Sequence, residues 1–127
     1  MIFMSEQPGI TQVKNITKEL DLPYHFLSKN MQIVSKAGLV DAKRGIDGGV
    51  KLAKDPSEIK VIDIIRAVDG DKYFDRCILG MGDCDCERIC SLHEEWIKRK
   101  NELIEIFSAM SLEDISRDIK AHKIKRI

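Results

Sequence analysis

The chain has 127 residues, of which 43% are hydrophobic and 33% charged, and its 21 basic and 21 acidic side chains give a net charge of zero. This length suits one domain, or one domain with an added oligomerisation element, and the composition is that of a globular protein. The sequence contains neither an apolar run long enough to cross a membrane nor a signal peptide. We therefore expect a cytoplasmic protein without a membrane partner.

The N-terminal part predicts a short apolar helical stub over residues 1–4, which a Pro-Gly pair ends. Thr11 can cap the next helix, whose apolar residues Val13, Ile16 and Leu20 recur at helical spacing. After a turn at residues 21–23, a third helix is predicted from residue 24 to 36. Its expected buried residues are Phe26, Leu27, Met31 and Val34. Asn30 interrupts that face, so it requires either a hydrogen-bond partner or a shifted buried face.

The middle of the chain predicts a β-hairpin, because two short runs between residues 39 and 53 flank a basic, glycine-rich tip. A helix is expected over residues 59–68, with Val61, Ile64, Ile65 and Val68 facing inward. A loop-like cysteine segment follows, and then a long helix over about residues 91–110. Ser111 and Asp114 form a near capping box for a last short helix, and the basic tail from residue 118 is expected to fray.

These elements predict a mainly α fold with a small β-hairpin wing, that is, a winged helix-turn-helix plus a long dimerisation helix. We divide the chain into a DNA-binding domain at 1–69, a cysteine-rich cluster-binding loop at 70–91, and the dimerisation helix with its tail at 92–127. The charge follows a similar division. Residues 11–53 carry seven basic and four acidic side chains, whereas residues 69–95 carry three basic and eight acidic ones. This asymmetry favours two surfaces with different partners, although solvated charge on any small domain can divide in this way.

A helix that fits the major groove and a basic wing indicate a double-stranded DNA operator as the partner. The outward candidates on the third helix are Tyr24, His25, Ser28, Lys29 and Gln32. The candidates on the hairpin are Lys43, Arg44, Gly45 and Lys51. An arginine on a thin tip can enter a narrow minor groove, and glycine amides can approach phosphates closely. The alternative is a plain helical hairpin with a solvated face, for which a basic tip has little structural use.

All four cysteines lie within fourteen residues, and a histidine follows them. The candidate metal ligands are Cys77, Cys84, Cys86, Cys90 and His93. In a reducing compartment this cluster favours a metal or redox site over a disulfide framework. Thiolates, sometimes with histidine, hold iron–sulfur clusters, and Gly80 and Gly82 let the loop fold around a bulky core.

Three other interpretations of the cysteines compete with a cluster. Four thiols, or three thiols and a histidine, also suit zinc, although paired C-x-x-C motifs are absent from the sequence. A thiol switch would oxidise Cys84 with Cys86 or Cys90 to a disulfide. Buried packing fits this polar loop least well. His93, at the start of a helix, can instead serve only as a cap or hydrogen-bond donor.

The long helix carries apolar residues at helical spacing, namely Leu92, Trp96, Leu103, Ile104 and Phe107. They can pack on the chain's own core, but the helix is long for so small a domain, which favours a dimer interface. A homodimer also suits DNA recognition, because twofold proteins read paired half-sites. An enzyme is not expected, since the sequence shows no nucleophile–base pair and no phosphate loop.

The segments AGLVDAKRGIDGGVKLA and VIDIIRAVDG, the cysteine loop and SLHEEW resemble the Rrf-two family of bacterial winged-helix regulators, over residues 2 to about 116. The resemblance implies a dimeric transcription regulator with an iron–sulfur cluster, 2Fe–2S or 4Fe–4S, in the loop before the dimerisation helix. Members usually have additional residues that complete the first helix, so we expect the start of that helix to be missing from this chain. Val50 stands where the family often has an aromatic residue.

By this resemblance, Cys77, Cys84 and Cys90 match the family's cluster cysteines. His93 matches the histidine ligand of the iron–sulfur assembly regulator. Nitric-oxide-sensing relatives instead take a carboxylate from the partner subunit's first helix. Cys86 lies outside the pattern, as a fourth ligand, a redox thiol or a bystander. The predicted function is transcription regulation that senses redox, nitric oxide or iron–sulfur status. The alternative is a zinc- or thiol-switch regulator or interaction protein without a cluster.

Overall fold

A computed structural model describes residues 1–84 and 90–121 of the chain. Its elements are, in order, α1 (Ile2–Ser5), α2 (Val13–Leu20), α3 (Tyr24–Lys36), β1 (Val40–Lys43), β2 (Gly49–Leu52), α4 (Val61–Asp69), the 3-10 helix η1 (Tyr73–Asp75), α5 (His93–Ala109) and α6 (Leu112–Ala121). The mainly α fold with a hairpin wing is therefore confirmed. In the described part of the chain, no helix has the length and apolar character that crossing a membrane requires.

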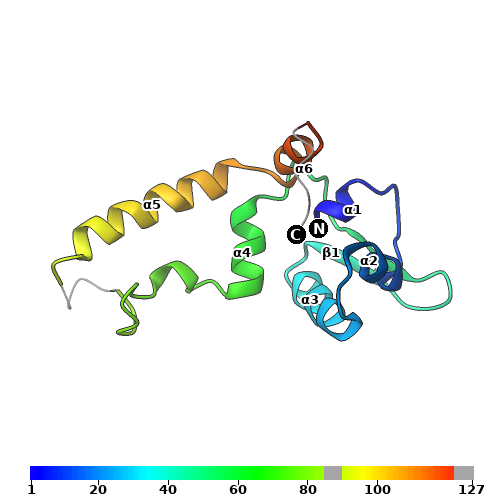
Figure 1. Ribbon diagram of the computed structural model, residues 1–127, viewed down its shortest axis with the longest axis horizontal. Coiled ribbons are helices and arrows are strands. Elements are labelled where there is room, and N and C mark those ends of the chain that lie inside the picture. Colours follow the sequence, from blue (N-terminus) through cyan, green and yellow to red (C-terminus); the bar gives the residue numbers. More distant parts are fainter. Residues whose placement is uncertain (85–89, 122–127) are drawn as a thin grey trace.

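The molecule has two parts of different shape (Figure 1). The first, which we call the winged body, contains α1 to α4, the two strands and α6. The second, which we call the arm, comprises η1, the cysteine segment and α5. The long α5 begins at the end of the arm farthest from the winged body, beside the cysteine segment. It runs back toward the body, where its last turn leads into α6 (Figure 1).

The wing is an antiparallel pair in which Val40 faces Leu52 and Lys43 faces Gly49. A third short segment joins its free edge, because the Thr11 amide donates to the Val50 carbonyl at 2.9 Å and the Val50 amide donates to the Thr11 carbonyl at 2.8 Å. The prediction that Thr11 caps the next helix is therefore wrong. Helix α2 starts at Val13 without a side-chain cap, since the backbone of Thr11 belongs to the sheet.

Two glycines of the wing are required by close packing of the backbone. A Cβ atom at Gly48 would clash with the carbonyl oxygen of Lys43. A Cβ at Gly49 would lie 2.5 Å from the carbonyl oxygen of Thr11, on the third segment. Glycine is the residue that permits such backbone approaches. These contacts fix the shape of the wing where it meets the rest of the body.

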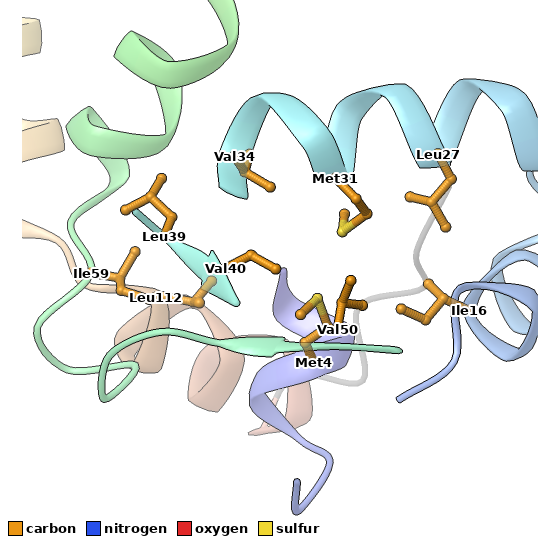
Figure 2. Packing of buried hydrophobic residues seen from close by; sticks show 10 residues of the cluster. All are labelled: Met4, Ile16, Leu27, Met31, Val34, Leu39, Val40, Val50, Ile59 and Leu112. Atoms are coloured by element: carbon orange, nitrogen blue, oxygen red, sulfur yellow. The ribbon is translucent and has the colours of Figure 1, made fainter. Parts of the chain in front are cut away.

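The hydrophobic core lies between α3, the wing, α1 and the start of α6 (Figure 2). It contains Met4, Ile16, Leu27, Met31, Val34, Leu39, Val40, Val50, Ile59 and Leu112. Ile59, Leu112 and Val40 are fully buried. Burial of one such side chain contributes about 1.5–3 kcal/mol, so these residues hold the winged body together.

One expected core residue of α3 lies on the surface, so the prediction that Phe26 is buried is wrong. The buried face of α3 runs through Leu27, Met31 and Val34. Phe26 precedes Leu27 by one residue and therefore points about 100° away from that face, which leaves it 59% exposed. The Asn30 side chain, which needed a partner, donates to the Phe26 carbonyl at 3.0 Å.

Helix α4 buries a different residue from the ones that the sequence predicts. Val68 is exposed, so the prediction that it faces inward is wrong, and Ile62 is the buried residue of this helix. Val61, Ile64 and Ile65 are half-buried around an apolar pocket of about 530 Å³ between α1, α2, α4 and α6.

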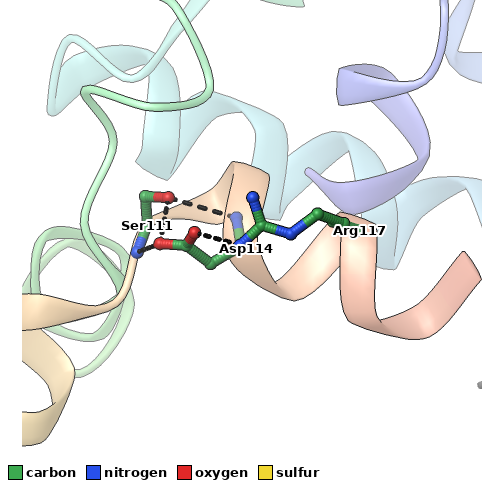
Figure 3. A network of polar contacts seen from close by, with 3 residues as sticks. All are labelled: Ser111, Asp114 and Arg117. Carbon is green, nitrogen blue, oxygen red and sulfur yellow. Dashed lines mark hydrogen bonds and ion pairs between the residues drawn. The ribbon is translucent and has the colours of Figure 1, made fainter. Parts of the chain in front are cut away.

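The predicted capping box at the start of α6 is confirmed (Figure 3). The Ser111 amide donates to Asp114 Oδ2 at 3.0 Å, and the Asp114 amide donates to Ser111 Oγ at 3.1 Å. The Ser111 hydroxyl and amide together lower the pKa of Asp114 to about 2, with a smaller contribution from Arg117. Residues 118–121 are helical rather than frayed, and the rest of the tail lies outside the described residues.

Candidate DNA interface and cysteine site

A groove of about 760 Å³ lies between α3 and the wing, with the start of α2 at one end. It collects most of the residues that the sequence predicts for DNA contact, namely Tyr24, Ser28, Gln32, Lys43, Arg44 and Gly45. The helix and wing candidates therefore share one concave surface. Helix α3 presents Ser28 and Gln32 there because its opposite side carries the buried core residues.

The remaining DNA candidates lie outside this groove. Lys51 is exposed on β2, and His25 and Lys29 are exposed on α3. The His25 ring packs edge-on against Tyr24, with 5.9 Å between the ring centres. His25 and Lys29 thus extend the α3 surface beyond the groove rather than lining it.

Two lysines that the sequence reading missed also line the groove. Lys14 comes from the first turn of α2, and Lys36 from the last turn of α3. Together with Lys43 and Arg44, they make four cationic side chains among the described residues that line the groove, and none of these lining residues is a carboxylate. Such a set can neutralise phosphates along a duplex. The sequence carries no local signal for Lys14. Its position at the groove depends on the pairing of the nearby Thr11 with the wing, which only the structure shows.

The cysteine segment begins as a small antiparallel loop. The Cys77 amide donates to the Gly82 carbonyl and the Cys84 amide to the Asp75 carbonyl, both at 2.7 Å, and Arg76 pairs with Asp83. In such pairing, alternate residues share a face, so Cys77 and Cys84 lie on the same side of the loop. Both thiols are half-buried.

His93 is the first residue of α5, and it faces this loop. Its amide donates to the Cys90 carbonyl at 3.0 Å, and its Nδ1 lies 3.4 Å from Cys84 Sγ. The side chain is almost fully buried, with 9% exposure. The structure thus brings Cys84 and His93 into contact, and a backbone hydrogen bond joins His93 to Cys90. The predicted ligand Cys86 lies outside the described residues.

The base of the loop is attached to α5 at two points. Phe74 is buried and its ring centre lies 6.3 Å from that of Phe107. One residue on, Asp75 Oδ1 lies 4.0 Å from Lys100 Nζ, and the Lys100 side chain is only 12% exposed. Since the Asp75 carbonyl also holds the Cys84 amide, Asp75 connects a cysteine to α5 directly.

The donor atoms suit an iron–sulfur cluster chemically, because three thiols and an imidazole are among the ligands that hold such clusters. A further fitting feature is the Trp96 indole nitrogen, which is buried without a hydrogen-bond partner in the described part of the chain. Within residues 1–84 and 90–121, however, no three His, Cys, Asp or Glu side chains are arranged to hold a metal ion.

The apolar residues of helix α5 differ in exposure. Phe107 packs toward the chain's own η1, and Trp96 and Ile104 are half-buried. The exposed residues form what we call the α5 stripe, which consists of Leu92, Leu103, Ile106 and Met110. Two of these, Ile106 at 52% exposure and Met110, were missing from the predicted dimer residues.

Comparisons with known proteins give consistent results. The sequence profile of the Rrf2 family, described as an iron-dependent transcriptional regulator, matches residues 1–118. An HTH-type transcriptional regulator of Aquifex aeolicus (strain VF5) is 32% identical over 109 residues, which cover 84% of this chain and 75% of the relative.

Two solved structures are similar in fold. The T. potens IscR structure has a TM-score of 0.75 and 26% identity, covering 99% of this chain and 84% of the other. The structure of CymR (YrzC), called the global cysteine regulator of B. subtilis, also has a TM-score of 0.75 and 26% identity. That alignment covers 91% of this chain and 86% of the other.

Proposed function

Because the chain belongs to the Rrf2 family of DNA-binding transcription regulators, we propose that its cysteine loop holds an iron–sulfur cluster and that the state of this loop controls operator binding. The relatives are transcription regulators and not enzymes. The signal would be redox change, nitric oxide or iron–sulfur supply. The division into a DNA-binding domain at 1–69, a cluster loop at 70–91 and a dimerisation part at 92–127 is part of this proposal.

The observation that carries the proposal is the contact between Cys84 Sγ and His93 Nδ1. It places two donors of the expected kind together, although nine residues separate them in the chain. Cys77 lies on the same face of the loop as Cys84 through the backbone pairing of residues 75–77 with 82–84. Cys77, Cys84, Cys90 and His93 are the residues that would hold the cluster, with Cys86 as an additional candidate.

When bound, the cluster supplies an iron–thiolate centre that oxidants and nitric oxide can attack. The chain's own residues then determine what the loop does. Phe74 and Asp75 attach the loop to α5, and α5 packs on α4, which packs on α3. A change in the loop therefore reaches the DNA-reading helix through contacts that are already formed, and it shifts the population of binding-competent molecules.

At the DNA, Ser28 and Gln32 are the side chains of α3 that would reach base edges in the major groove. Arg44 on the wing would enter the minor groove, and the lysines of the groove would neutralise phosphates. The α5 stripe would seat a second copy of the chain, so that two α3 helices meet paired half-sites.

The test is anaerobic purification followed by iron, sulfide and zinc analysis and a visible spectrum. We expect iron and sulfide in equal amounts with charge-transfer absorption, and loss of both in Cys84→Ser. Ser91→Ala, one residue after Cys90 on an exposed position, is the matched control and should keep the cluster. Zinc alone, or no metal in a strictly anaerobic preparation, would refute the cluster.

A second candidate function is a thiol switch without a cluster. The Cys84–His93 contact favours it, because the thiolate is the reactive form of cysteine and a neighbouring imidazole can accept the thiol proton. In a metal-free sample, peroxide would then form a disulfide at Cys84 and change operator affinity. If peroxide leaves operator affinity unchanged, this candidate fails.

A further inference from the structure

The chain has one tryptophan, Trp96, and its indole N–H is in an unusual position. The nitrogen is buried, and no described residue accepts a hydrogen bond from it. Buried N–H groups nearly always have a partner, because leaving one unpaired costs about 1–3 kcal/mol. The indole nitrogen is a donor only, so its partner must be an acceptor.

The position of Trp96 on α5 suggests where that acceptor lies. Its amide donates to the Leu92 carbonyl at 2.8 Å, which places it in the first turn of α5, three residues after His93. Side chains of a helix lean toward its N-terminus and cover the preceding turn. The indole is thereby carried toward the end of α5 where His93 and Cys90 meet the cysteine loop.

Sulfur is the acceptor that this end of the helix offers. Cys84 Sγ already lies against His93, and hydrogen bonds to sulfur are one of the means by which proteins adjust iron–sulfur centres. The nearest carboxylates on α5, those of Glu94 and Glu95, are on exposed positions. The competing acceptor is a group of a second copy, because Trp96 neighbours Leu92 of the α5 stripe, four residues earlier on the helix.

We propose that the indole N–H of Trp96 donates a hydrogen bond to a thiolate sulfur of the loaded cysteine site. Trp96 is then a positioning residue of that site rather than a residue of the dimer interface. This assignment rests on the proposed function, since it needs a metal-loaded loop. It accounts for the unpaired nitrogen, which would find its acceptor only when the thiols are deprotonated and drawn together.

A single tryptophan makes the test direct, because protein labelled with ¹⁵N at the indole gives one side-chain indole resonance. We would titrate the full chain anaerobically with Zn²⁺ as a redox-inert probe, and follow thiolate ligation in parallel with Co²⁺ absorption. The indole proton should move downfield and saturate with the metal. Trp96→Phe keeps a ring but removes the donor, and should weaken Zn²⁺ binding about tenfold.

The matched control is Tyr73→Phe, which removes an exposed polar atom next to Phe74 and should leave Zn²⁺ affinity unchanged. The proposal is overturned if metal binds without moving the indole resonance, or if Trp96→Phe binds Zn²⁺ as the wild type does. A resonance that follows protein concentration instead of metal would assign the N–H to a second copy, which also overturns it. If neither metal binds, the cysteine site itself fails, and Co²⁺ absorption distinguishes that result from a failure of the Trp96 assignment alone.

Discussion

The winged body and the arm differ in how far their own side chains bury one another. The core of the winged body draws residues from α1, α2, α3, both strands and α6. In the described part of residues 70–110, by contrast, only Phe74 and His93 are buried. Local stability follows such packing, so we expect the body to be the more stable part and the arm to open more easily.

This difference suits a sensor. A surface that reads DNA needs fixed distances, and the core and the wing glycines provide them. A part that responds to a signal must have two states of similar free energy, and a thinly packed segment with half-buried thiols meets that need. The two parts meet where α4 packs against both α3 and α5.

The largest expected effect is on the body. Ile59→Ala empties a site of 0% exposure and should lower the free energy of unfolding by about 2–5 kcal/mol, as measured by urea denaturation. Ile106→Ala, on the α5 stripe, should change the unfolding of the monomer by less than about 0.5 kcal/mol. Equal losses for the two variants would contradict the division into a packed body and a thinly packed arm.

The second effect concerns self-association through the α5 stripe. The double variant Leu103→Asp with Ile106→Asp places charge on the stripe of both copies and should weaken the dimer by about 30-fold or more. Sedimentation velocity at micromolar concentration measures this. Glu105→Gln, on an exposed position between the two, is the control. If the double variant still sediments as the wild type does, the stripe is not the interface.

The third effect concerns the groove. Arg44→Ala should weaken binding to a selected operator by about tenfold or more and relax the preference at the bases it contacts. Lys54→Ala removes an exposed cation that lies outside the groove and should have little effect. Fluorescence anisotropy with labelled duplexes measures both, and equal losses would indicate nonspecific attraction instead of a defined surface.

A smaller effect is expected for the lysines at the ends of the groove. Lys14→Ala and Lys36→Ala should each reduce the slope of log affinity against log salt by about 0.9, with unchanged sequence preference. Binding isotherms at several salt concentrations test this. A changed sequence preference would mean that a lysine contacts bases, and an unchanged slope that it contacts no phosphate.

The smallest effect concerns the capping box of α6. Its pKa of about 2 for Asp114 lies below the usual 3.8, so the box stabilises the folded state above about pH 4 and loses that contribution as the pH falls toward 2. Ser111→Ala should return the Asp114 pKa toward its usual value, as followed by NMR titration. A pKa that stays near 2 in this variant would assign the shift to the Ser111 amide and Arg117 rather than to the hydroxyl.

Several elements were predictable because their signals are local. The stripe of α3, the glycine-rich wing and the Ser111–Asp114 box each depend on residues close in the chain. The error at Thr11 came from a contact between distant segments. Thr11 has the composition of a cap, but its backbone pairs with Val50, and no local pattern announces that pairing.

The candidate sites show the same limit. The sequence supplied the cysteines, the histidine and most residues of the groove. It did not supply Lys14 and Lys36, because the position of α2 against the wing depends on the Thr11–Val50 pairing. It also grouped half-buried and exposed residues of α5 into one stripe, since the packing of Phe107 on Phe74 covers only part of that helix.

The wing glycines have a consequence for anyone who would redirect the protein to another operator by mutagenesis. Randomising the whole tip would mostly yield misfolded wings, because any side chain at Gly48 or Gly49 meets the backbone of Lys43 or Thr11. Ile46, which is 96% exposed, and the exposed Asp47 can vary freely. A library limited to these two positions and to Arg44 would therefore sample new contacts while every clone keeps its wing.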